Sequence, residues 1–323
     1  MTPDKLSIEY LTQMDLPNVI VYAAPVMFTL VAIEWIISLR QNKDFYNGKD
    51  TLAATTIGIG NVIVSAAVKV GTFALVVVFY NLSPFRIPPE WRSYILCLFA
   101  LDLARYWAHR IAHEQRFWWA THVTHHNSKK YNFSVSFRLS WTQHIKIVFF
   151  LPVIMMGFDP FVFFIVHQVA VLYQFWIHTE YIRKLPKPIE FFFTTPSHHR
   201  VHHATNEKYI DRNYGSTFII WDRMFGTFQP EEEQAIYGIT KNVDTYNPIT
   251  LVFHEWVDIF KDLGKAKSLR EAWWLVWGNP TDIARAKVAA QSEGGDEENL
   301  AIDNRQLTMD NALPAVAVEV GDN

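Results

Sequence analysis

Eight histidines fall into three short blocks whose spacing suits metal binding. His109 and His113 are four residues apart, so on a helix they project from one face. Two further blocks share one pattern, in which a histidine is followed by two more at the third and fourth positions after it; they comprise His122, His125, His126, His199, His202 and His203. A neutral imidazole binds a divalent metal through one ring nitrogen and donates its other N–H to an acceptor. The spacing therefore predicts three helical segments that direct these imidazoles toward one site.

The number of histidines indicates two metals. Eight imidazoles supply about four ligands to each of two metals, whereas a single zinc ion needs only three or four. The one cysteine of the chain, Cys97, excludes an internal disulfide and a site with several thiolates. His178, at the end of a later apolar stretch, is expected as a ninth ligand. His198 falls outside the repeated pattern, so we expect it at an outer or surface position.

Carboxylates near the blocks are candidates to orient the imidazoles. Asp102 lies seven residues before His109, on the same helical face two turns deeper, where an acid without a role would be costly. We therefore expect Asp102 to orient a ligand histidine. The other candidate acceptors are Glu114, Glu180 and Asp211. Each of these three could equally be a solvated charge. A helix is expected to begin at Pro196, with Ser197 as its N-cap.

The remaining histidines have simpler explanations. His144 and His254 are isolated, and we expect them to be ordinary polar residues rather than ligands. His167 lies within an apolar arm and fits either role. For the three blocks, a membrane-surface patch that uses histidine as a pH sensor is an alternative, although it does not require the repeated pattern.

Long apolar stretches indicate a membrane protein. Residues 19–39 are long enough to cross a hydrocarbon core of ~30 Å as a helix, and their flanks favour a retained anchor over a cleaved signal peptide. Further spans are expected at residues 52–82, from residue 93 onward, and in an apolar hairpin at 145–180, either as two spans or as a re-entrant pair. We therefore predict an all-α fold, a polytopic membrane helical bundle of about four or five membrane helices with a cytosolic helical cap that carries the di-metal site.

Basic residues favour the cytoplasmic side for the histidine blocks. Lys and Arg concentrate in residues 40–49 and 105–138, whereas the loops on the opposite side hold only Lys5, Arg86 and Arg92. We expect a multi-pass protein of a bacterial inner membrane or of the endoplasmic reticulum. A net charge of -3 without a run of basic and aromatic residues excludes a nucleic-acid partner.

The chain is expected to have four parts. They are N-terminal membrane anchor helices at 1–92, a histidine-box catalytic domain at 93–265, a peripheral amphipathic segment at 266–290, and a disordered acidic tail at 291–323.

The blocks, in this order between apolar stretches, resemble the fatty acid hydroxylase superfamily, also called the sterol desaturase family, of integral membrane di-iron oxygenases. The likeness covers about residues 94–230. Within this superfamily, the sequence is most similar to the ether-lipid-cleaving alkylglycerol monooxygenase branch, in the segments AHEQRFWWATHVTHHNSKKYNFSVSFR and TPSHHRVHHATNEKYIDRNYG. Position by position, the eight block histidines match the ligand pattern of the family, and Glu114 matches a position associated with activity.

The resemblance implies O2 activation at two irons and hydroxylation of a C–H bond in a lipid, whether an ether lipid, a sterol or a fatty acyl chain. The chain has no nucleotide-binding glycine fingerprint, haem motif or iron–sulfur cysteines, so the reductant must be external, either tetrahydrobiopterin or an electron-transfer protein. The aromatic runs at 117–119 and 191–193 are expected to line a lipid channel or to form an interfacial belt.

Two other functions remain open. One is a zinc-dependent membrane lipid hydrolase, in which the metal activates a water molecule. The other is a metal carrier or sensor without catalysis.

Overall fold

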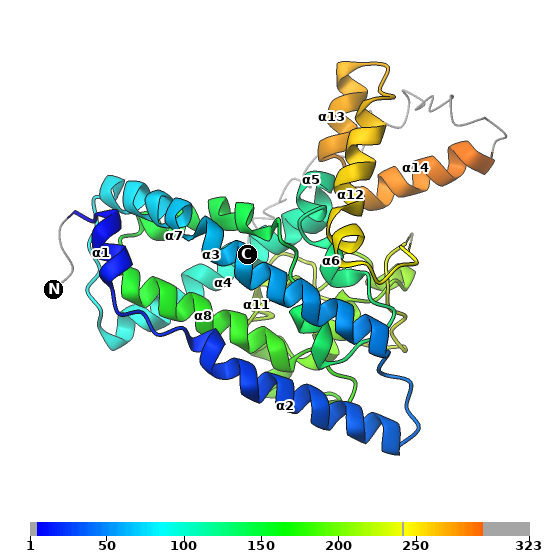
Figure 1. The fold of residues 1–323 in the computed structure, drawn as a ribbon, viewed down its shortest axis with the longest axis horizontal. Helices are drawn as coiled ribbons and strands as arrows, with labels where there is room; N and C mark the ends of the chain where they lie inside the picture. The colour runs from blue at the N-terminus through cyan, green and yellow to red at the C-terminus, as the bar shows by residue number, and fades with distance from the viewer. Residues whose placement is uncertain (1–4, 241, 293–323) are drawn as a thin grey trace, which may run out of the picture. The chain divides into compact units, whose positions relative to one another are not determined.

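The computed structural model describes residues 5–240 and 242–292, and every regular element among them is a helix (Figure 1). Three isolated bridges pair single residues, so this part of the chain contains no named strand. The predicted all-α class is therefore confirmed. The described residues up to Pro280 form one compact unit, and those from Thr281 to Ser292 belong to a second.

Two helices in the described part of the chain are long and apolar enough to cross a membrane. Helix α2 (Val19–Arg40) follows the predicted first span. Helix α3 (Gly48–Leu82) begins four residues before the predicted second span, because the Asn47 side chain accepts hydrogen bonds from the backbone N–H groups of Lys49 and Asp50. Only 11% of the most apolar window of each helix is buried. Apolar side chains that point outward in this way do not form the core of a soluble protein, and they suit contact with lipid.

The predicted apolar hairpin forms, but its two arms are unequal. The first arm consists of the 3-10 helix η2 (Gln143–Phe150) and α7 (Leu151–Met155), and the second is α8 (Pro160–Trp176). From the rise of these helix types, the first arm extends ~23 Å and α8 ~26 Å. Gly157 makes the turn at φ +81, where a Cβ atom would lie 2.1 Å from the Phe85 carbonyl oxygen. Both arms are therefore shorter than a hydrocarbon core of ~30 Å.

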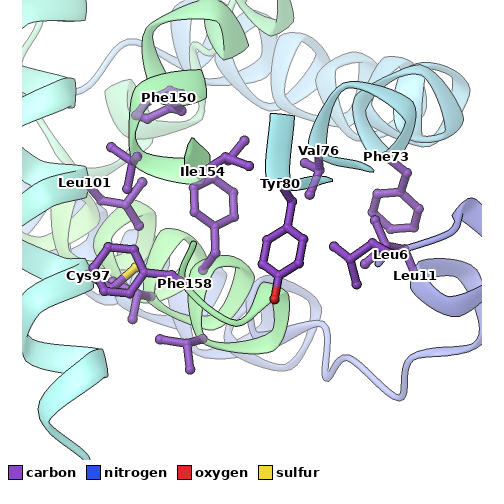
Figure 2. Packing of buried hydrophobic residues seen from close by; sticks show 14 residues of the cluster. Leu6, Leu11, Phe73, Val76, Tyr80, Cys97, Leu101, Phe150, Ile154 and Phe158 are labelled. Carbon is purple, nitrogen blue, oxygen red and sulfur yellow. The ribbon is translucent and has the colours of Figure 1, made fainter. Parts of the chain in front are cut away.

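A buried apolar core holds these helices together (Figure 2). It joins α1 (Ile8–Gln13), α3, α7 and α8 to the first turns of α4 (Trp91–Glu114), where Cys97 and Leu101 are fully buried. Farther along, α4 packs along α8. Because α4 starts in this core and ends with His109 and His113, it links the apolar bundle to the first histidine block.

Apart from the hairpin, most of the helices after α4 are short. They are α5 (Arg116–Trp119), α6 (Val123–His126), η1 (Phe133–Phe137), α9 (Lys187–Phe192), α10 (Pro196–His202), η3 (Glu207–Tyr209), α11 (Ile220–Met224), α12 (Pro248–Leu263), α13 (Leu269–Trp277) and α14 (Pro280–Ser292). Helix α13 packs against α12 and α5, so the expected divisions at 92/93 and 265/266 fall within the first compact unit. Most of the predicted acidic tail, residues 293–323, lies outside the described residues.

Candidate metal centre

Buried arginines hold the short helices that carry the second and third histidine blocks. A four-residue helix such as α6 has no stability of its own. Arg138 fixes α6 by donating hydrogen bonds to the Thr124 carbonyl oxygen (3.2 Å) and to Asp50 of α3 (2.8 Å). Arg200 of α10 pairs with Glu231 (2.6 Å) and also donates to the carbonyl oxygens of residues 179 and 182.

The start of α10 differs from the prediction. Its N-cap is Thr195, and Pro196 occupies the first helical position. Proline suits that position because its missing N–H would have no partner there, so the cap must be the preceding residue. Ser197 lies inside the helix and donates its hydroxyl to Glu190 (2.7 Å). The expectation that Ser197 is the N-cap was therefore wrong.

The structure brings all nine predicted ligand histidines into two neighbouring groups. The first group contains His109, His113, His122, His126 and His202. The second contains His125, His178, His199 and His203. Within each group, one ring nitrogen from every member lies within 4.8 Å of the others. That these nine residues bind metal stays a prediction. Their ring nitrogens lie close enough together for each group to hold one metal ion.

The two repeated blocks divide their histidines between the groups in a reciprocal way. His122 and His126 face the first group, while His125 between them faces the second. In the last block the pair His199 and His203 faces the second group, and His202 faces the first. The blocks meet where the Nε2 atoms of His126 and His202 lie 3.2 Å apart, and those of His125 and His203 3.1 Å apart. Each of the two repeated blocks therefore contributes to both groups.

The unpartnered nitrogens of this cluster fit metal binding. The Nε2 atoms of His109 and His113 are buried and have no hydrogen-bond partner among the described residues, although both belong to the first group. Burial, together with neighbouring imidazoles, lowers the pKa of His199, His202 and His203 well below the usual 6.5. These side chains are therefore neutral at pH 7, which is the form that binds a metal.

Backbone carbonyl groups orient several of the imidazoles. The Nδ1 atoms of His109, His202 and His178 lie 2.8, 3.0 and 2.6 Å from the carbonyl oxygens of residues 214, 212 and 174. An N–H at Nδ1 would leave Nε2 free to bind a metal, as outer hydrogen bonds commonly do at such sites.

The comparison with known families agrees with this geometry. Residues 94–227, which include all nine histidines, match the model of the family described as Fatty acid hydroxylase. This part of the chain is therefore similar to the fatty acid hydroxylase domain. The resemblance predicted from the histidine blocks is thereby confirmed.

Several characterised proteins are similar to the chain. Alkylglycerol monooxygenase of Homo sapiens is 35% identical over 299 residues, which cover 91% of this chain and 63% of that protein. Alkylglycerol monooxygenase of Xenopus tropicalis is 37% identical over 252 residues, covering 76% and 55%. Ornithine lipid hydroxylase OlsE of Rhizobium tropici is 28% identical over 170 residues, covering 48% and 49%. The chain thus spans less than two thirds of the length of these relatives. No solved structure matches it.

The carboxylates of the hydroxylase domain lie at varied distances from the imidazoles. Asp211 lies nearest, with one oxygen 3.5 Å from His113 Nδ1. Glu114 pairs with Arg110 (2.8 Å), and Glu180 accepts a hydrogen bond from the Tyr237 hydroxyl. Of the three further acceptors expected from the sequence, only Asp211 has a histidine of the cluster as a partner among these contacts.

Asp102 is fully buried and binds a loop rather than an imidazole. It accepts hydrogen bonds from the backbone N–H groups of Thr217 (2.8 Å) and Phe218 (3.0 Å) and from the Trp221 indole (3.0 Å). This loop continues from Tyr214, whose carbonyl oxygen is the partner of His109. Asp102 therefore contacts the segment that orients a histidine, not the histidine itself.

His198 occupies an outer position, as expected, but it is buried rather than at the surface. Its Nε2 lies 2.9 Å from Glu190. Burial alone would raise the pKa of Glu190, but hydrogen bonds from His198, the Leu185 N–H and Ser197 lower it to about 2. The other three histidines, His144, His167 and His254, also lie outside both groups.

Three residues of the site were missed by sequence analysis. Trp119 packs its ring 5.0 Å from that of His113 and 5.4 Å from that of His126. Tyr131 lies 5.3 Å from the His203 ring and borders a cavity of about 810 Å³ that Glu180 and Tyr237 also line. Arg116 anchors α12 and α13 beside the second block. Trp119 belongs to an aromatic run noted in the sequence, but Tyr131 and Arg116 have no local signal.

Proposed function

We propose that the chain is a membrane-embedded di-iron monooxygenase that hydroxylates a C–H bond of a lipid with O2. The observation that carries this proposal is the pair of neighbouring groups, five and four histidines, assembled within a fatty acid hydroxylase domain. The outward apolar faces of α2 and α3 support a lipid environment. The named activities of the relatives, a monooxygenase and a lipid hydroxylase, support the reaction type.

The number of histidines suits a pair of metals, and the proposed reaction requires that these metals be redox-active. Two irons bound by the two groups would supply the redox change that O2 activation needs, which zinc cannot provide. The residues of the chain hold the imidazoles neutral, fix their orientation through backbone carbonyl groups, and exclude water with the rings of Trp119 and Tyr131.

The exposure of the histidines suggests the side from which the lipid arrives. Seven of the nine are buried, whereas His109 and His122, both in the first group, are half-buried. We propose that the lipid approaches there and enters from the bilayer around the apolar helices. Glu114 closes α4 one residue after His113 and is half-exposed, so it remains our candidate for a residue that acts at this opening.

The reaction needs two electrons and two protons from outside, since insertion of one oxygen atom of O2 into a C–H bond releases the other as water. We propose that an external reductant, tetrahydrobiopterin or an electron-transfer protein, supplies them. The ether-lipid substrate class rests on the alkylglycerol monooxygenase relatives, and a sterol or acyl chain is the alternative. We place the histidine cluster on the cytoplasmic side, where the basic loops lie.

Metal analysis and an anaerobic assay test the proposal together. The purified protein is expected to hold two irons per chain and to modify lipid only when O2 is present. His199→Ala should abolish turnover and lower the iron content, while His254→Ala, outside both groups, should change neither. Lipid turnover that proceeds equally well without O2, with stoichiometric zinc, would establish the hydrolase instead. Metal binding with no turnover of any extracted lipid class would indicate a carrier or sensor.

A further inference from the structure

Helix α12 presents an apolar stripe on the outside of the molecule. Ile249, Phe253, Val257 and Phe260 follow one another at intervals of four, four and three residues, so they share one face, and Phe260 is 69% exposed. The helix rests on the rest of the molecule through other residues, Leu251, Val252 and Ile259, which are buried. The stripe is therefore not the face that packs on the core.

Helix α13, which packs against α12, also carries exposed apolar residues. Leu269 is 91% exposed and Trp273 68% exposed, and they lie one turn apart. An isolated exposed apolar residue needs no explanation, but six large ones on a single helical hairpin mark an interaction surface.

The tip of the hairpin is basic. Lys261, Lys265, Lys267 and Arg270 are all exposed. Of the nearby acids, Asp262 is bound to buried Arg116 (2.6 Å), Asp258 lies 3.8 Å from Lys261, and Glu271 accepts a hydrogen bond from the Lys267 backbone N–H (2.7 Å). Exposed apolar residues beside a basic cluster are typical of segments that bind the surface of an anionic membrane.

The direction of the hairpin suits such a role. In Figure 1, α12 and α13 run across the direction of α2, α3 and α8. Among the described residues, α2 and α3 are the two helices long and apolar enough to cross a bilayer. If they cross it, a hairpin that runs across them lies along the membrane surface, attached through Arg116 to the segment just before the second histidine block.

We propose that the α12–α13 hairpin is a membrane-surface arm. Its apolar stripe inserts at the boundary between the headgroups and the acyl chains of the cytoplasmic leaflet, and its basic tip binds anionic phospholipid headgroups. This inference uses the membrane placement in the proposed function but not the iron chemistry. Arg116 joins the arm to the site, because it binds both helices and lies six residues before His122.

Single-cysteine labelling of the full chain in lipid nanodiscs tests the arm. The native Cys97 is buried, so Cys97→Ala gives a background in which Val257→Cys and Asp258→Cys can each carry an environment-sensitive fluorophore. These adjacent positions form a matched pair, since Val257 belongs to the stripe and Asp258 does not. The nanodiscs contain either neutral or anionic phospholipids, with a quencher attached to the acyl chains, and iodide serves as the aqueous quencher.

The label at Val257 is expected to be quenched by the acyl-chain quencher and to be shielded from iodide about fivefold relative to the label at Asp258. Replacing Lys265, Lys267 and Arg270 by Gln should weaken the lipid quenching in anionic nanodiscs only. Equal iodide quenching at both positions would overturn the proposal. Shielding of Val257 from both quenchers would also overturn it, because a protein would then cover the stripe. None of these measurements depends on iron or turnover, so failure of the arm is distinguishable from failure of the enzymatic proposal.

Discussion

Arg116 offers the sharpest test of how the helical hairpin is attached to the histidine site. Its side chain is 3% exposed and donates to Glu255 and Asp262 of α12, both at 2.6 Å, and to the Leu275 carbonyl oxygen of α13 at 3.1 Å. Its backbone N–H donates to the Gly278 carbonyl oxygen (3.0 Å). One residue thus binds α12, α13 and the segment that follows them.

Arg116→Met is expected to cost about 3 to 5 kcal/mol of stability. Methionine fills a similar volume but leaves the carboxylates of Glu255 and Asp262 without their cation, and only 16% and 12% of these side chains is exposed. Breaking a buried ion pair by removing one partner costs about this amount, because the remaining charge stays buried and uncompensated. Unfolding of the purified protein in detergent, followed by intrinsic tryptophan fluorescence, measures the loss.

A triple variant separates charge from packing. When Arg116→Met is combined with Glu255→Gln and Asp262→Asn, no uncompensated charge remains, and most of the lost stability should return. If Arg116→Met alone costs less than about 1 kcal/mol, the typical value of an exposed pair, then the residue does not anchor the hairpin as we argue. A triple variant no more stable than the single one would show that charge burial is not the cause.

Three further predictions concern the metal centre and its supports. His202→Ala and His203→Ala remove expected ligands from different groups. Metal analysis of each variant should therefore find about one tightly bound iron per chain. Loss of both irons in either variant would argue against two separate sites. Asp102→Asn should lower the free energy of unfolding by about 1 to 3 kcal/mol per disrupted hydrogen bond, while turnover per bound iron stays unchanged. If Asp102 were a catalytic carboxylate, turnover per bound iron would fall and stability would change little. Burial raises the pKa of Asp222 from 3.8 to about 6, so the folded chain keeps this proton to a higher pH than the unfolded chain does. As the pH rises from about 4 to about 6, the unfolding free energy of the wild type should therefore fall by about 3 kcal/mol relative to that of Asp222→Asn. A pH-independent difference between the two proteins would contradict this.

The positions of the ligand candidates could be predicted because their spacing is a local property. Residues four apart share a helical face whatever surrounds the helix, so the pairs His109 with His113 and His122 with His126 follow from the sequence. The division between two groups could not be predicted in the same way. It depends on how α6 meets α10, two short helices more than seventy residues apart in the chain, and that meeting is fixed by tertiary contacts.

Asp102 shows where reasoning from one helix stops. The seven-residue spacing correctly places it on the face of α4 that carries His109, but it does not say what packs against that face two turns deeper. The structure brings Thr217 and Phe218 there, and two backbone N–H groups at the start of a loop are strong partners for a carboxylate. The same limit applies to Arg116, whose partners Glu255 and Asp262 come from a segment about 140 residues later.

The two groups of histidines are not equivalent, and the difference bears on the proposed mechanism. The five-histidine group contains both half-buried members, His109 and His122, whereas the four-histidine group is wholly buried and lies beside Tyr131. The cavity bordered by Tyr131 has a mixed lining, in which charged side chains such as Lys129 and Glu180 lie beside apolar ones such as Phe45 and Ile236, and on the proposed function it would admit a soluble reductant. An oxygenase needs its lipid and its electrons at the same centre, yet a reductant that shared the lipid opening would have to leave before each turnover. On the proposed function, unequal exposure of the two groups would let lipid and electrons reach the metals from different sides, and the two repeated blocks, each with histidines in both groups, would connect the metals.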